Sequence, residues 1–89
     1  MEATLTVIGF ARTTLIGRVH DVQWAAEHGM ARVTIPLKAT KELTYRVLFA
    51  GEKARLQIVP GVACYVEGSM MMDDGPAYLR AQRWRVLYE

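Results

Sequence analysis

The fold is decided between residues 43 and 68, in the stretch LTYRVLFAGEKARLQIVPGVACYVEG. Inner and outer side chains alternate from Leu43 to Phe49 and again from Val62 to Met72, which is the period-two pattern of a half-buried strand. Between them, residues 51–58 hold good helix formers and no β-branched residue before Ile58, and Pro60-Gly61 ends the run. The stretch therefore predicts a strand, a short helix and a strand. The predicted inward positions are Leu43, Tyr45, Val47, Phe49, Val62, Cys64, Val66 and Gly68.

Three further strands are predicted outside this stretch. Residues 15–23 form one candidate, a loop follows from Trp24 to Gly29, and residues 30–39 alternate strictly. In the last strand, Leu79 and Ala81 share one parity while Trp84 and Val86 share the other. A β-bulge near Gln82–Arg83 would bring all four side chains into the core. The turn signal in residues 73–76 joins the last two strands as a hairpin.

This order predicts an all-β domain, a five-stranded OB-fold barrel with one short helix between the third and fourth strands. A generic β-sandwich is the alternative, but it does not explain a helix at that place. We expect Gly17 and Gly68 to allow the sharp coiling of a small barrel. The whole chain, residues 1–89, is predicted to be a single domain. About residues 1–14 form an extra N-terminal strand, with Leu5 to Phe10 as its candidate, and residues 15–89 form the core.

Composition limits the function classes. The chain has 89 residues, a net charge of +2 and one cysteine, Cys64, which excludes an internal disulfide and fits a reducing compartment. We expect a cytoplasmic protein, or a phage or plasmid product that acts in the cytoplasm, because neither a signal peptide nor an apolar run of membrane-spanning length is evident. A Ser-centred elbow, a Gly-rich phosphate loop and paired-Cys metal spacing are also missing. The expectation is therefore a protein without enzymatic activity, metal or cofactor.

Four stretches resemble the bacterial single-stranded-DNA-binding proteins and the related primosomal protein PriB. They are LIGRV (residues 15–19), ARVTI (31–35, followed by Ala39-Thr40), YRVLFAGEKA (45–54) and GVACYVEG (61–68). The resemblance covers roughly residues 15–87 and implies an OB fold that binds single-stranded DNA. Two positions that the family uses for base stacking fall on Thr44 and Ala50, which cannot stack. The loop from Lys38 to Thr44 is short and the family's acidic C-terminal tail is not found, so the chain resembles a reduced member.

Single-strand binding requires cations for phosphates and flat groups for bases. The outer faces of the second and third strands, the usual OB platform, carry cations, with Glu42 the only acid nearby in sequence. The alternative to phosphate binding is that each cation simply lies on a solvated strand face. The alternative to base stacking is that Trp24 anchors its loop. Arg83 and Arg85 form a basic row with Arg80 on the last strand, and the sequence leaves open whether this row is part of the nucleic-acid-binding surface. The predicted nucleic-acid-binding residues are Trp24, Arg32, Thr34, Lys38, Lys41, Arg46, Tyr65, Tyr78 and Arg80.

Three functional hypotheses follow from the sequence. The first is sequence-tolerant binding of single-stranded DNA by an accessory protein of replication, recombination or repair. The second is an OB-fold adaptor subunit that mediates protein–protein contacts in a replication or recombination assembly. The third, RNA or oligosaccharide binding, uses the same fold. A homodimer or homotetramer is expected under the first two, because a small barrel leaves strand edges open.

Overall fold

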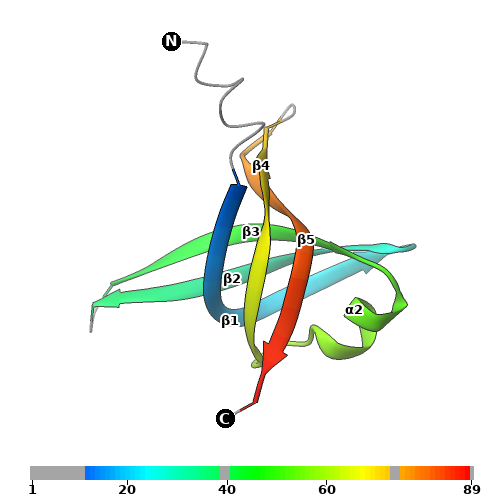
Figure 1. Cartoon of the computed structure of the whole chain (residues 1–89), viewed down its shortest axis with the longest axis horizontal. Coiled ribbons are helices and arrows are strands. Elements are labelled where there is room, and N and C mark those ends of the chain that lie inside the picture. Colours follow the sequence, from blue (N-terminus) through cyan, green and yellow to red (C-terminus); the bar gives the residue numbers. More distant parts are fainter. Residues whose placement is uncertain (1–11, 39–40, 73–74, 89) are drawn as a thin grey trace.

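Five strands close into a barrel in the computed structural model, which describes residues 12–38, 41–72 and 75–88 (Figure 1). The elements are β1 (Arg12–Ala25), β2 (His28–Lys38), β3 (Lys41–Ala50), α2 (Glu52–Gln57), β4 (Ala63–Met71) and β5 (Tyr78–Leu87). Around the barrel the strands follow the order β1-β2-β3-β5-β4, and β3 pairs with β5 in parallel while the other pairs are antiparallel. The helix lies between β3 and β4 in the chain, so the OB-fold prediction is confirmed. The predicted extra strand from Leu5 to Phe10 lies outside the described residues.

β1 belongs to both sides of the barrel. Residues 12–18 pair with β4, and residues 18–25 pair with β2. Figure 1 shows the strand bending from its place beside β4 to its place alongside β2. The register shifts between Val19 and Asp21, so His20 has no partner on β2. This bulge moves Val22 and Trp24 onto core parity, and both pack against the core.

The core is filled by alternate side chains of all five strands and closed at one end by α2. Ala54 of the helix and Ile58 just after it are both fully buried. The Phe49 and Trp84 rings pack edge to face, with their centroids 6.1 Å apart. Burial raises the pKa of the Cys64 thiol to about 11, which fits an unreactive core residue. The buried apolar side chains are Leu15, Val19, Ala31, Val33, Val47, Phe49, Ala54, Ile58, Cys64, Val66, Leu79 and Val86.

Two local predictions are wrong. The loop predicted from Trp24 to Gly29 is a tight turn at Ala26 and Glu27, and Trp24 lies within β1 opposite Gly29. Leu43 was expected in the core, but 43% of its surface is exposed. β3 pairs with β5 only at Val47 and Leu48, so the start of β3 extends beyond the part of the strand that β5 covers. The described part of the chain contains no helix long and apolar enough to span a membrane.

The bulge predicted in the last strand is confirmed and lies next to a close backbone approach at Gly68. Glu67 lies opposite Arg83 and Gly68 lies opposite Ala81, so Gln82 is the extra residue. A Cβ at Gly68 would lie 1.9 Å from the carbonyl oxygen of Arg80. Glycine is therefore required here because the crossing strand leaves no room for a side chain.

Replacing Gly68 by alanine should lower the free energy of unfolding by about 3 kcal/mol, because β4 and β5 must separate to admit the methyl group. Gly75→Ala is the control, since a Cβ there meets no atom within 4 Å. The control should change stability by less than about 0.5 kcal/mol. Urea unfolding of both variants measures the difference, and equal stabilities would contradict the close approach.

Candidate nucleic-acid interface

One outer surface of the barrel collects predicted cations from neighbouring strands, and we call it the platform. The second half of β1, together with β2, β3 and the start of β5, provides its side chains. The strand register determines which platform side chains are neighbours, through the pairs Asp21–Arg32, Gln23–Met30, Arg32–Arg46 and Leu48–Arg80. The platform comprises Asp21, Gln23, Met30, Arg32, Thr34, Arg46, Leu48, Tyr78 and Arg80.

Arg32 on the platform is held by an acid from the next strand. Its Nε lies 3.0 Å from each carboxylate oxygen of Asp21, and Nη2 donates to Oδ2 as well. The hydrogen bond from Arg32 and then its positive charge lower the pKa of Asp21, although some desolvation acts the other way. The same carboxylate raises the pKa of Arg32. Asp21 therefore orients the guanidinium and compensates its charge locally.

Arg46 lies directly across from Arg32 on β3. Its Nη1 donates to the carbonyl of Pro76 at 3.4 Å, a long bond that leaves most of its donors available. A shallow depression of about 270 Å³ lies between the arginines and is lined by Asp21, Gln23, Met30, Arg32 and Arg46. It therefore combines two guanidinium groups with the flexible apolar side chain of Met30.

The parallel pairing of β3 with β5 decides which of the β5 arginines, Arg80, Arg83 and Arg85, lie on the platform. Arg80 lies opposite Leu48 and is exposed, so it extends the platform from β3 onto β5. Arg83 lies opposite Glu67, and Arg85 lies 5.8 Å from the Tyr65 ring, both on the surface that β5 shares with β4. By this register, Arg80 belongs to the platform and Arg83 and Arg85 do not.

The structure brings some of the predicted binding residues together and separates others. Arg32, Thr34, Arg46, Tyr78 and Arg80 share the platform; the Thr34 hydroxyl donates to the Arg18 carbonyl at 3.3 Å. Lys41 is exposed at the start of β3, opposite Lys38, whose side chain is not described.

Tyr65 and Trp24 lie away from the other predicted residues. Tyr65 is on β4, opposite Ile16 and Arg85, so β1 and β5 separate it from the platform. Trp24 packs against the core at the end of the barrel and lines a different pocket. Neither aromatic ring can serve as the stacking surface of the platform.

Sequence reasoning missed the acid at the centre of the platform. Glu42 seemed to be the only nearby carboxylate because Asp21 is eleven residues from Arg32 along the chain. A signal did exist. Leu15, Gly17 and Val19 share one parity while Val22 and Trp24 share the other, the same phase shift that revealed the bulge in β5. Met30 was missed as a platform residue because apolar side chains are usually assigned to the core.

Two solved structures show what this architecture resembles. A chain of the S. pombe Stn1–Ten1 complex matches with a TM-score of 0.70 and 17% identity, covering 88% of this chain and 59% of that chain. A deletion mutant of the single-stranded DNA-binding protein from Thermus aquaticus matches with a TM-score of 0.64 and 17% identity, covering 88% of this chain and 41% of that one. The chain thus spans about half the length of these proteins, and the likeness is one of fold. No protein-family model and no curated sequence matches the chain.

Removing the Arg32 guanidinium should return the pKa of Asp21 toward its ordinary value of 3.8. In the native protein this lowered pKa means that the ion pair stabilises the fold above about pH 4 and loses that effect as the pH falls through the folded pKa. NMR titration of the Asp21 carboxyl carbon in the native protein and in Arg32→Ala measures the change. Arg46→Ala is the control, because Arg46 donates to Pro76 instead; an unchanged midpoint in Arg32→Ala would refute the pairing.

Proposed function

We propose that the chain binds single-stranded DNA with little sequence preference, as an accessory protein of replication, recombination or repair. The observation that carries the proposal is the row of Arg32, Arg46 and Arg80 on three adjacent strands of the outer barrel surface. Guanidinium groups suit this role because they bind phosphates and also stack on bases. The fold likeness to a bacterial single-stranded DNA-binding protein supports it.

The chemistry of the platform favours the backbone of the ligand over its bases. Thr44 and Ala50, which replace stacking positions of the family that the sequence resembles, are both exposed on β3 and offer no flat group. Met30 and Leu48 supply apolar contact without a hydrogen-bonding pattern that could distinguish bases. Phosphate contacts are independent of sequence, so the platform should bind many sequences with similar affinity.

A second candidate, an adaptor or oligomer interface, is favoured by a different surface. Ile16 is 58% exposed on β1 and lines an apolar groove with Pro36, Ala63 and Leu87. This groove supports a homodimer or homotetramer, or a complex with another replication or recombination protein. Sedimentation of the chain alone with Ile16→Lys as the variant tests self-association, and a monomeric native chain would exclude the homo-oligomer.

Binding to a fluorescein-labelled oligo-dT, followed by anisotropy at several salt concentrations, tests the proposed function. We expect a plot of log Kd against the logarithm of the salt concentration to have a slope of about 2 to 3. This is the slope for roughly four phosphate contacts to a single strand. Arg46→Ala and Arg80→Ala should each reduce that slope by about 0.7 and weaken binding.

Arg83→Ala is the matched control, because it removes the same charge from the β4–β5 surface. It should leave the slope nearly unchanged. A flat salt response, or an equal effect of all three substitutions, would refute binding through the platform.

A further inference from the structure

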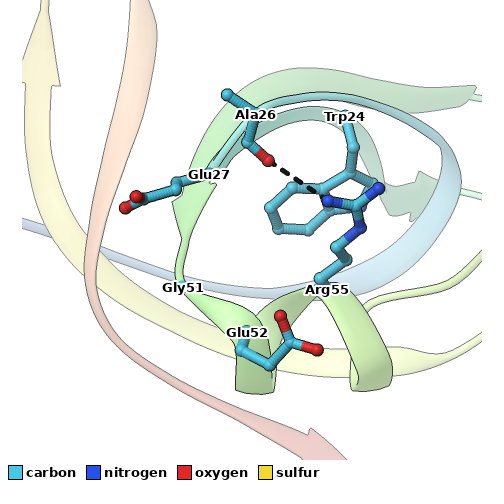
Figure 2. Close-up of a pocket in the computed structure, with 6 residues that line it drawn as sticks. All are labelled: Trp24, Ala26, Glu27, Gly51, Glu52 and Arg55. Atoms are coloured by element: carbon cyan, nitrogen blue, oxygen red, sulfur yellow. Dashed lines mark hydrogen bonds between the residues drawn. The ribbon is translucent and has the colours of Figure 1, made fainter.

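A second pocket opens at the end of the barrel (Figure 2). It has a volume of about 350 Å³ and lies between the β1–β2 turn and α2. Gln23 lines the platform depression and Trp24 lines this pocket, so neighbouring residues of β1 contribute to the two sites from opposite faces of the strand. The turn and the helix are tied together by the bond from the Gly51 amide to the Glu27 carbonyl, at 3.1 Å. Gly51 has a φ of 101°, which glycine adopts readily.

Trp24 presents one face of its indole ring to this pocket. A Cβ built on Gly29 would lie 2.5 Å from both Cδ2 and Cε2, the two atoms that the indole rings share. The ring therefore lies flat over the Gly29 backbone, and its other face is left for the pocket. The cation–π contacts among the described residues involve Trp84 and Tyr65, so no cation described here occupies the Trp24 ring. A flat aromatic face beside a pocket is a stacking surface for a base.

Arg55 and Glu52 add hydrogen-bonding groups of opposite kind. They lie three residues apart on α2, on neighbouring turns of one helix face, and both are exposed. Arg55 Nη1 donates to the Ala26 carbonyl at 3.3 Å, the dashed line in Figure 2, which leaves most of its five donors available. In the described part of the chain neither residue forms an ion pair. The pocket thus places the hydrogen-bond donors of the Arg55 guanidinium and the acceptor oxygens of the Glu52 carboxylate next to the Trp24 indole ring.

We propose that this pocket binds a guanine base. The base stacks on Trp24, the Glu52 carboxylate accepts hydrogen bonds from guanine N1–H and the N2 amino group, and Arg55 donates to O6 and N7. Among the DNA bases, guanine is the one that combines a two-donor edge with the O6 and N7 acceptors. A carboxylate also repels phosphate, so the pocket recognises the base and leaves the backbone to the platform. In a DNA strand this inference rests on the proposed function; a free guanine mononucleotide presents the same chemistry.

The pocket supplies its own control residue. Glu27 also lines the pocket, but Figure 2 shows its carboxylate pointing away from Trp24 and Arg55. Glu27→Gln and Glu52→Gln remove the same charge from the same region. Only Glu52→Gln replaces an acceptor of the proposed base pairing with an amide.

The test compares labelled oligo-dT with the same oligonucleotide carrying one central dG. The dG substitution should tighten binding about ten-fold, a typical effect of one well-placed bidentate contact. Replacing that dG by inosine, which lacks the N2 amino group, or by 7-deazaguanine should remove part of the gain. Glu52→Gln should abolish the preference for dG over inosine, whereas Glu27→Gln should retain it.

A parallel titration with guanosine monophosphate separates the pocket from the platform. NMR of the indole N–H groups should show a shift of Trp24 and none of Trp84, and adenosine monophosphate should shift neither. Salt-dependent binding of oligo-dT without any gain from dG, and no shift with the mononucleotide, would overturn the guanine pocket while the proposed function stands. A Trp24 shift with guanosine monophosphate in a chain that binds no oligonucleotide would overturn the proposed function and keep the pocket.

Discussion

The short parallel contact between β3 and β5 is the constraint on which the rest of the structure depends. Its pairs, Val47–Leu79 and Leu48–Arg80, close the barrel. Next to the contact, β5 changes the direction of its side chains at Gln82, and Gly68 lets β4 pass against the Arg80 carbonyl. Closure buries Val47, Phe49 and Leu79 completely and leaves the earlier part of β3 outside the barrel.

The same contact defines the platform. Without it, Arg80 would belong to a row with Arg83 and Arg85 along one strand. With it, Arg80 joins Arg32 and Arg46 on the outside of three adjacent strands, whereas Arg83 and Arg85 lie beyond the β3–β5 pairing and have partners only on β4. The short extent of the β3–β5 pairing thus distributes the basic residues of β5 between two surfaces.

The charges of the platform and of the pocket at the barrel end differ in sign, which fits the proposed division of roles. The platform carries three arginines and one aspartate, while the pocket at the barrel end carries one arginine and two glutamates. A net charge of only +2 conceals this difference, because the acids compensate the bases in the total and not at each site. In the proposed binding mode the first surface contacts phosphates and the second contacts base edges.

The sequence by itself determined the strand order, the helix between β3 and β4, the bulge at Gln82 and the core parity of most buried side chains. These features depend on periodicity and on turn residues, which act over a few neighbours in the chain. Tertiary structure decided the Asp21–Arg32 pair, the exposure of Leu43, the separation of Tyr65 from the platform and the placement of Trp24 over Gly29. Each of these depends on which strands meet and in what register, and a one-residue bulge at His20 changes the outcome for every residue after it in β1.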